Sequence, residues 1–288
     1  MKYPKISIVT PSYNQGQFLE ETIQSVIGQM YPNLEYIIID GGSTDNSVEI
    51  IKKYEQHISY WVSEPDQGQS HAINKGFRKA TGDILAWINS DDYYLPGTLK
   101  FIASQLKNVK TKTILFGNAM HMYHGTERVF GSNVSKNFCE MDFRIHDTII
   151  QPSSFWNRSV LEEVGFLNED MHYTFDWEWF IRAQSSSVQF KSVNNYLSVY
   201  RITGENKTVT GGDIRKKEIA NIYKNYSSKK VFKANEYIKR NKDIIDKFIS
   251  CTNKIRPHRL RVVLFKLCFP QVAKFDYKYI QTFIHYNR

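Results

Sequence analysis

The stretch GDILAWINSDDYYLP, residues 82–96, joins five apolar residues at 84–88 to a polar segment with two adjacent carboxylates, Asp91 and Asp92. Such a short apolar run, preceded by a glycine, is typical of a buried strand. Neighbouring carboxylates repel each other, so their charge requires either water or a cation nearby. The stretch therefore predicts a buried strand that ends at a charged edge, facing solvent or a bound cation.

Similar apolar runs precede this stretch, and helical patterns lie between them. Strands are predicted in KISIVTPSY, LEYIIID and ISYWVSEPD, and helices in FLEETIQSVIGQ, SVEIIKKYEQ and QSHAINKGFRKA. A further helix through TLKFIASQL and a strand at TILFGNAM continue the pattern, which becomes irregular after about residue 120. Strands that alternate with helices form a parallel sheet, and such sheets bind ligands beyond the carboxyl ends of their strands. Ser12, Asp40, Asp66 and Asp91 all fall there.

Length and composition place the chain among ordinary soluble globular proteins. It has 288 residues, 41% hydrophobic and 23% charged, enough for one large domain or one domain with an extension. The three cysteines, Cys139, Cys251 and Cys268, have no C-x-x-C spacing, which argues against a disulfide framework and a zinc site. The sequence shows no secretory signal and no run of about 18 apolar residues. A reducing, cytoplasmic compartment is the expectation.

The positive charge is concentrated in the last quarter of the chain. Residues 213–288 contain 19 Lys and Arg against 6 Asp and Glu, a net of +13, so with +9 for the whole chain residues 1–212 carry −4. This asymmetry predicts an α/β domain at 1–212 and a basic helical extension at 213–288. A slightly acidic body disfavours nucleic-acid binding.

The extension includes KIRPHRLRVVLFKLCFPQVAKF, residues 254–275, which mixes basic and apolar residues. A basic amphipathic helix of this kind is typical of peripheral contact with a membrane surface. A solvated face on a helical subdomain and an oligomer contact are the alternatives.

Common nucleotide-binding fingerprints are absent from the sequence. It contains no G-x-G-x-x-G and no G-x-x-x-x-G-K-[ST], which excludes the usual dinucleotide and P-loop signatures. The segment GGSTD, residues 41–45, follows a predicted strand and precedes a helix, so it can be a tight turn with a helix cap or part of a site.

The segments IVTPSYN, IIIDGGSTDNS, EPDQGQSHAINKGFRKATGD and NSDD resemble, in order and spacing, the donor-site motifs of family 2 glycosyltransferases, inverting enzymes of the GT-A fold. The resemblance covers roughly residues 5–100. It continues through IIQPSSFWNRSVLEEVGFLNEDMHYTFDWEWFIR, which is similar to the acceptor half of the family's bacterial polysaccharide branch, and fades after about Thr208. It implies a mixed, Rossmann-like sheet flanked by helices, with nucleotide-sugar binding at 1–100 and the acceptor side at 101–212.

The resemblance also implies which residues bind the donor. Positions that match the family's nucleotide-sugar site are Thr10, Pro11, Tyr13, Asn14, Asp40, Asp66, Gly68, Asn74, Arg78, Asn89 and Ser90. Among them, Asp40 is implied to read the base, usually uracil. The family's D-x-D matches residues 89–91, with Asn89 in place of the first aspartate. Asp91, with Asp92 nearby, is therefore the implied ligand of a divalent cation, Mn²⁺ or Mg²⁺.

The implied catalytic base is Asp176, in the segment YTFDWEWFIR. It matches the aspartate of the family's Glu-Asp pair, with Phe175 in place of the glutamate and Arg182 at the helix arginine. The alternative role for Asp176 is a helix N-cap. Acceptor contacts are expected from Gln151, Trp156, Glu178 and Arg201.

The implied activity is transfer of a hexose or N-acetylhexosamine from a nucleotide diphosphate sugar, in most such enzymes a UDP-sugar, with inversion. The implied acceptor is a hydroxyl of a glycan or lipid-linked saccharide in cell-surface polysaccharide synthesis, such as capsule or lipopolysaccharide. A cytoplasmic enzyme in peripheral contact with the inner face of the membrane fits this role. The rivals are a non-catalytic nucleotide-sugar- or membrane-binding module and a sugar nucleotidyltransferase, although TPSYNQGQF lacks the Arg and Lys expected of the latter.

Overall fold

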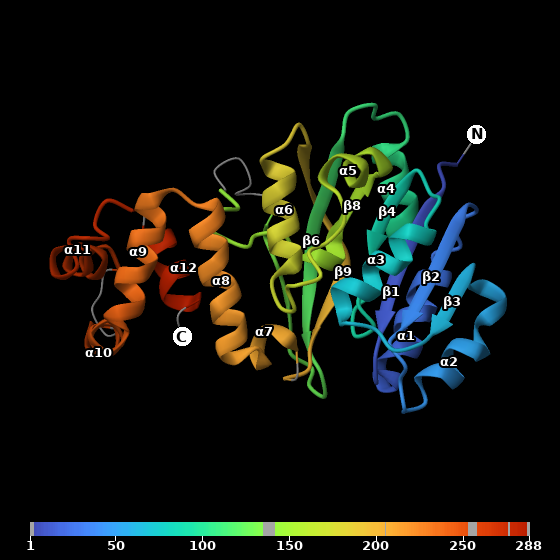
Figure 1. The fold of residues 1–288 in the computed structure, drawn as a ribbon, viewed down its shortest axis with the longest axis horizontal. Coiled ribbons are helices and arrows are strands. Elements are labelled where there is room, and N and C mark those ends of the chain that lie inside the picture. The colour runs from blue at the N-terminus through green and yellow to red at the C-terminus, as the bar shows by residue number, and fades with distance from the viewer. Residues whose placement is uncertain (1–2, 135–141, 205, 253–257, 276, 287–288) are drawn as a thin grey trace. The chain divides into compact units, whose positions relative to one another are not determined.

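The computed structural model describes residues 3–134, 142–204, 206–252, 258–275 and 277–286. The chain divides into two compact units, one formed by residues 1–141 and 148–210 and the other by residues 142–147 and 211–288. Figure 1 shows a sheet flanked by helices in the first unit and helices α8–α12 in the second.

A mixed sheet forms the centre of the first unit. In the described residues its strands follow the order β3-β2-β1-β4-β8-β6-β9-β5, with β7 paired to β6. The pairs β1–β2, β1–β4 and β2–β3 are parallel, as predicted, whereas β8 runs antiparallel to both β4 and β6. The strands are β1 (Ile6–Ser12), β2 (Leu34–Asp40), β3 (Tyr60–Ser63), β4 (Ile84–Trp87), β5 (Tyr93–Tyr94), β6 (Thr113–Tyr123), β7 (Val129–Gly131), β8 (Ser154–Asn157) and β9 (Gln189–Ile202).

Helices follow the first three strands, in agreement with the sequence pattern. The helices of this unit are α1 (Gly16–Ile27), α2 (Ser47–Lys53), α3 (Gln69–Lys79), α4 (Thr98–Leu106), α5 (Arg158–Val164), α6 (Phe175–Gln184) and α7 (Lys207–Thr210). Short 3₁₀ helices are η1 (Glu55–His57) and η3 (Gln151–Ser153).

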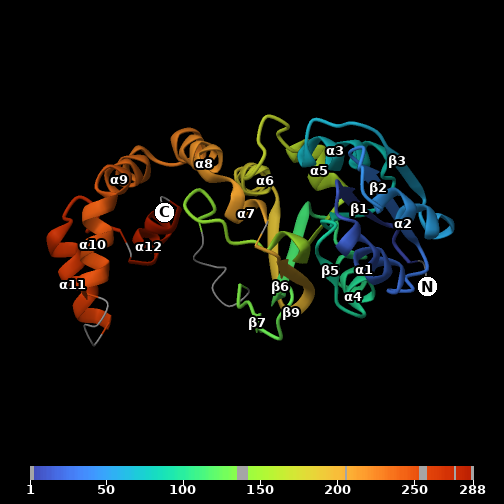
Figure 2. The ribbon, with the colours of Figure 1, turned by 90° about the horizontal axis from the view of Figure 1, so that it is seen from below.

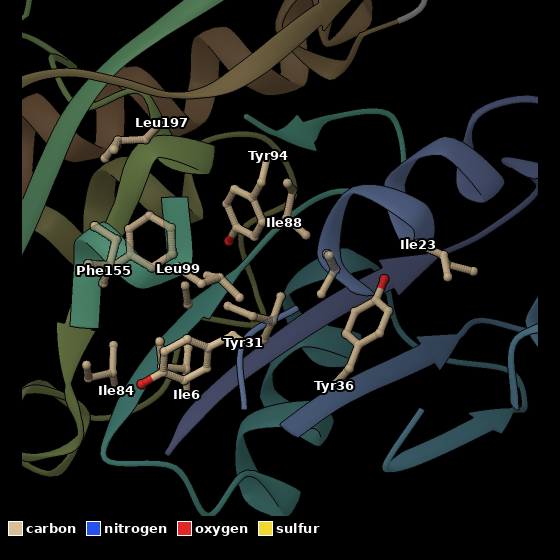
Figure 3. Packing of buried hydrophobic residues seen from close by; sticks show 14 of the residues in the cluster. Ile6, Ile23, Tyr31, Tyr36, Ile84, Ile88, Tyr94, Leu99, Phe155 and Leu197 are labelled. Carbon is tan, nitrogen blue, oxygen red and sulfur yellow. The ribbon is translucent and has the colours of Figure 1, made fainter. Parts of the chain in front are cut away.

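The two faces of the sheet carry different cores. On one face, alternate residues of β1, β2 and β4 pack with α1 and α4, and Figure 3 shows Ile6, Tyr36, Ile84 and Leu99 in this cluster. On the other face, aromatic rings of α3, β4, β8 and α6 contact one another at centroid distances of 4.8–6.1 Å; they belong to Phe77, Trp87, Trp156 and Trp179. Each such side chain stabilises the fold by about 1.5–3 kcal/mol when it leaves water.

A buried carboxylate, Glu35, lies near the start of β2, at the opposite end of the strand from Asp40. It accepts hydrogen bonds from Lys5 Nζ at 2.6 Å, Ser7 Oγ at 2.5 Å and both the backbone N and Oγ1 of Thr81 at 2.6 Å. Burial alone would raise the pKa of Glu35, but these bonds outweigh it and lower the pKa to about 2.

Glu35→Gln is expected to destabilise the chain most at neutral pH. Because the folded-state pKa lies below the ordinary value of 4.5, the carboxylate contributes stability above pH 4.5 and loses it as the pH falls toward 2. The shift corresponds to about 3 kcal/mol at pH 7. Urea unfolding of both proteins at several pH values should show the difference shrinking with acidity; a difference independent of pH would contradict this account.

The second unit is helical in the residues described, as the sequence predicts. It contains α8 (Gly212–Tyr226), α9 (Lys229–Arg240), α10 (Lys242–Thr252), α11 (His258–Cys268) and α12 (Tyr277–Tyr286). Its core includes Ile222, Tyr223, Ile238, Phe265 and Ile280, all buried. None of the helices in the described ranges is long and apolar enough to cross a membrane.

Candidate functional site

The carboxyl ends of the first four strands meet at one edge of the sheet, as the parallel arrangement predicts. Ser12 pairs in register with Asp40, and Asp40 pairs with Ser63. On the other side of β1, β4 ends at Trp87 and leads to residues 88–92. The loops that follow these strands carry most of the polar residues singled out in the sequence.

The loops after β1 and β2 are tied together by hydrogen bonds. Asn14, in the left-handed conformation with φ 49°, donates its backbone N–H to Ser43 Oγ at 2.8 Å and accepts from the Thr44 N–H at 2.8 Å. The Gly16 N–H, at the start of α1, donates to Asp45 at 2.8 Å. Asn14 therefore holds the two loops in place, and the neighbouring Tyr13 projects from them with 61% of its surface exposed.

Asp40 is fully buried and organises its own loop. Its carboxylate accepts hydrogen bonds from the N–H groups of Gly42 and Ser43 at 3.1 and 2.8 Å, and from the hydroxyls of Ser43 and Ser63 at 2.6 and 2.7 Å. Three of these donors share Oδ2, and the Ser43 hydroxyl donates to Oδ1. The expected contact between this side chain and the base thus stays a prediction, and in this conformation Asp40 shapes residues 41–43.

Gly41 lies directly against the side chains of Tyr13 and Asp66. A Cβ atom at this position would lie 2.6 Å from Asp66 Oδ2 and 3.3 Å from the Tyr13 ring, so only glycine fits without movement. Asp66 also accepts the Gly68 N–H at 2.7 Å. An aromatic ring and a carboxylate on either side of a bare backbone suit a flat, hydrogen-bonding ligand. The sequence did not single out Gly41 in this role.

The two adjacent aspartates have different environments, and only one faces the open edge. Asp92 is fully buried and accepts the Arg201 N–H at 2.9 Å; burial and then the charge of Asp91 raise its pKa well above the ordinary value. Asp91 is half-buried and accepts from Asn206 Nδ2 at 3.2 Å, and burial raises its pKa as well. Asp92, expected beside the metal, is thus placed in the interior, which leaves Asp91 as the candidate ligand.

Arg201 is buried and is bonded to the backbone of Asp91. Only 4% of its surface is exposed. Its Nε donates to the backbone oxygen of Asp91 at 2.8 Å and its Nη2 donates to Glu21 at 2.6 Å. The guanidinium also lies 4.7 Å from the Phe18 ring centre and 5.4 Å from that of Tyr93. In this conformation these partners hold the cation inside and fix the Asp91 backbone, and the expected acceptor contact of Arg201 stays a prediction.

Asn89, which replaces the first aspartate of the D-x-D pattern, bridges α3 and the buried carboxylate. It accepts from Gln69 Nε2 at 2.7 Å, and its Nδ2 donates to Asp92 at 3.4 Å. An amide can make both bonds, whereas a carboxylate has no hydrogen to donate. The neighbouring Ser90 is buried, and its backbone oxygen accepts from Thr22 at 2.8 Å.

Asn89→Asp is expected to lower the thermal unfolding midpoint by several degrees in EDTA, because a further negative charge would stand beside Asp92. Mn²⁺ is expected to restore part of the loss. The measurement is a thermal melt with and without Mn²⁺, with Asn108→Asp, an exposed site on the first unit, as control. An unchanged midpoint in EDTA would show that Asn89 does not relieve repulsion at this loop.

Four of the predicted donor residues are buried or bonded to residues 166–169. Asn74 is buried, where it donates to the backbone oxygen of Leu167 at 2.9 Å and accepts the Leu167 N–H at 3.0 Å. Arg78 donates to Glu169 at 3.3 Å. Both side chains hold residues 166–169 against α3. Thr10 and Pro11 are buried too, and the Thr10 hydroxyl lies 3.1 Å from that of Tyr36 in the core.

The two acids in the first turn of α6, Asp176 and Glu178, have different surroundings. Glu178 is buried and forms a two-point ion pair with Arg182 Nε at 2.9 and 3.0 Å, while Arg182 Nη2 donates to the backbone oxygen of Phe166 at 2.7 Å. In this conformation Glu178 is occupied by this ion pair, and its expected acceptor contact stays a prediction. Asp176 is half-buried, and its Oδ1 accepts the Trp177 N–H at 2.8 Å. It is the acid of this turn that solvent reaches.

The two remaining acceptor candidates differ in their placement. Trp156 is fully buried in the aromatic cluster, with its ring 5.5 Å from Trp87 and 4.8 Å from Trp179, so an acceptor does not reach it in this conformation. Gln151 donates to the Trp87 backbone oxygen at 2.8 Å, at the end of β4, and its buried Oε1 has no hydrogen-bond partner within the described ranges.

The segment before α6 reaches the edge formed by the strand ends. Gly68 has φ 117°, and a Cβ atom there would lie 3.3 Å from His172 Nδ1. The Ser70 hydroxyl donates to the Met171 backbone oxygen at 3.3 Å, and Lys207 Nζ donates to that of His172 at 3.3 Å. These contacts connect the Asp66 loop, through His172, to the loop that carries Asn206 beside Asp91. His172 was not assigned a role from sequence, because an isolated histidine in a loop has no distinguishing pattern.

The side chains at this edge of the sheet suit a cation that takes only a few of its ligands from the protein. Across the described ranges no cluster of three or more His, Cys, Asp or Glu side chains could hold a metal. Mg²⁺ and Mn²⁺ prefer oxygen ligands, and in phosphate-transfer sites one or two carboxylates are often the protein's whole contribution. Asp91 fits this pattern.

Comparison with known proteins gives a consistent match. The family model for glycosyl transferase family 2 matches residues 7–165. An uncharacterized glycosyltransferase of Rickettsia typhi is 27% identical over 201 residues, 65% of this chain and 61% of that protein. The putative teichuronic acid biosynthesis glycosyltransferase TuaG of Bacillus subtilis is 38% identical over 94 residues, 31% of this chain and 36% of TuaG. The matched segments thus span less than two thirds of either relative.

Two solved structures have a similar fold. The crystal structure of residues 1–349 of S. aureus TarS with UDP-GlcNAc has a TM-score of 0.61 at 16% identity, covering 99% of this chain and 87% of that one. The mannosyltransferase PcManGT from Pyrobaculum calidifontis, in complex with GDP-Man and Mn²⁺, has a TM-score of 0.61 at 16% identity, covering 100% and 86%. At such identities the similarity concerns the fold.

Proposed function

Because the chain belongs to glycosyltransferase family 2 and has the GT-A fold, we propose that it transfers a sugar from a nucleotide diphosphate sugar to an acceptor hydroxyl. The observation that carries the proposal is the edge that runs from Tyr13 and Asp66, past His172, to Asn206 and Asp91. It offers a place for a base at one end and for a diphosphate at the other.

The base and nucleoside bind between Tyr13 and Asp66. The exposed ring of Tyr13 stacks on a flat base, and the Asp66 carboxylate accepts a hydrogen bond from a ring N–H, as uracil would provide. Asp40 supports this contact by fixing residues 41–43. UDP-sugar is the proposed donor class, supported by the UDP-GlcNAc complex of TarS, although PcManGT shows that a GDP-sugar fits the same fold.

Asp91 holds a divalent cation together with the donor's phosphates. When bound, the cation neutralises the charge that develops on the departing nucleotide diphosphate. Arg201 fixes the backbone at Asp91, and Asn206 orients its carboxylate. Gly68 and His172 bring the donor side next to the segment that leads into α6.

Asp176 acts as the general base. It removes the proton from the acceptor hydroxyl, whose oxygen attacks the anomeric carbon from the face opposite the leaving nucleotide, so the configuration inverts. The half-buried position of Asp176, next to a buried and ion-paired Glu178, supports this assignment.

The proposed acceptor is a growing glycan or a lipid-linked saccharide of a bacterial surface polysaccharide, at the cytoplasmic face of the membrane. The similarity to TuaG, a protein named for teichuronic acid biosynthesis, supports the polysaccharide context. The transferred group is a hexose or N-acetylhexosamine. The basic second unit supports a peripheral position at an anionic surface.

Thermal melts with UDP, GDP, dTDP and CMP, each with Mn²⁺ and with EDTA, test the donor site. A ligand at a hundred times its Kd stabilises the folded chain by about 2.7 kcal/mol, enough to raise the midpoint by several degrees. We expect UDP with Mn²⁺ to give the largest shift and EDTA to remove most of it. A folded sample that responds to none of the four nucleotides would refute the donor site and favour a non-catalytic module.

A further inference from the structure

Helix α11 carries an apolar face that is open to solvent. The side chains of Leu260, Val263 and Leu267 are 47%, 52% and 71% exposed. At about 100° per residue the three positions lie within an arc of about 60° on one side of the helix. Three large apolar side chains on one stripe, each more than 45% exposed, form a surface that water solvates poorly.

The opposite side of α11 is the one that packs into the second unit. Phe265 and Phe269 are buried, and their rings lie 5.6 and 5.4 Å from that of Phe248 on α10. Figure 2 shows α10 and α11 side by side. Since the helix already has a complete core-facing side, the face formed by Leu260, Val263 and Leu267 is not needed for packing within the unit.

The sequence on either side of α11 is strongly basic. Between Asp246 and Asp276 the sequence contains seven Lys and Arg and no Asp or Glu. On the helix, Lys266 lies on one flank of the apolar face. A second copy of the chain would bring the same positive charge, so repulsion opposes self-association through this face. An anionic surface with an apolar layer beneath it matches both the positive charge and the exposed apolar face.

We propose that α11 docks in the plane of an anionic lipid bilayer, with Leu260, Val263 and Leu267 in the boundary between headgroups and acyl chains. Lys266, on the flank of this face, contacts lipid phosphates. This inference deepens the peripheral location in the proposed function by naming the element responsible. Lipid binding requires no donor, so the two proposals can fail separately.

Sedimentation with vesicles tests the docking surface. The full chain should bind vesicles of phosphatidylglycerol and phosphatidylcholine, bind phosphatidylcholine alone only weakly, and release at high salt. The triple variant Leu260→Ser, Val263→Ser, Leu267→Ser should lower the partition coefficient at least about tenfold, because three apolar side chains no longer insert. Ile214→Ser on α8, which alters a side chain that is 55% exposed, is the matched control and should bind normally.

Circular dichroism establishes that the triple variant is folded, and sedimentation velocity gives the association state of each protein. Unchanged vesicle binding by the folded triple variant would overturn the proposal, since charge alone would then account for binding. Loss of a dimer in the triple variant would overturn it too, because the face would then pair copies of the chain. Release of nucleotide from a donor in solution should be the same for all three proteins.

Discussion

Asp176→Asn is expected to lower the rate of sugar transfer by about 10²–10⁴-fold, the usual contribution of a general base. Donor affinity should be unchanged, because the residue acts on the acceptor hydroxyl. The fold should be preserved as well, since an asparagine oxygen can still accept the Trp177 N–H that Asp176 accepts at 2.8 Å. The measurement is transfer rate under saturating donor, together with the Kd of the nucleotide.

Asp170→Asn provides the matched control for this change. Asp170 is an exposed acid in the same segment, six positions before Asp176 along the chain, and its neutralisation should leave the transfer rate within about twofold. Near-normal transfer by Asp176→Asn would show that Asp176 is not the general base. Its role would then be only that of a residue at the start of a helix. Equal losses in both variants would point to a general effect of negative charge in this loop.

Asp91→Asn is expected to remove most of the metal-dependent affinity for the nucleotide. The amide is a weak ligand for a hard cation, and a loss of at least about tenfold in affinity, or about 1.4 kcal/mol, should follow in Mn²⁺. In EDTA the variant and the parent should bind the nucleotide equally. Asn206 can still donate to the new side chain, so the loop should keep its shape.

Asp92→Asn makes the complementary test of this assignment. Its carboxylate is buried and accepts the Arg201 N–H, so the substitution should affect thermal stability and leave the response to Mn²⁺ intact. If instead Asp92→Asn loses the Mn²⁺ response and Asp91→Asn keeps it, the cation ligand is Asp92 and the loop rearranges on binding. Isothermal titration of UDP with and without Mn²⁺ distinguishes these outcomes.

The parallel half of the sheet could be predicted from sequence because its signal is local. Runs such as LEYIIID alternate with helical patterns, and strands arranged in this way bring their carboxyl ends to one edge. The antiparallel β8 could not be predicted, because its four residues are too few for a period. Its place beside β4 depends on packing of Trp156 against Phe77 and Trp87, whose rings are distant in sequence.

Sequence patterns placed polar residues near the site but did not show which way they point. Asp92 and Arg201 turn inward because they bond to each other's segment across 109 positions of the chain. Glu178 is neutralised by Arg182, four residues further along the helix, a spacing that could have signalled the pair. Gly41 and His172 became visible only through contacts with Asp66 and Gly68. Apart from the Glu178–Arg182 pair, the direction in which each side chain points depends on partners that are distant in sequence. No local sequence pattern encodes such partners.

The most direct test of the account is the configuration of the sugar first released from the donor. Slow hydrolysis of an α-linked UDP-sugar with Mn²⁺, followed by proton NMR before the free sugar equilibrates, reports the stereochemistry of the displacement. Attack from the face opposite the nucleotide predicts that the β-anomer appears first, and that Asp176→Asn suppresses its formation. Initial release of the α-anomer would contradict a single inverting displacement.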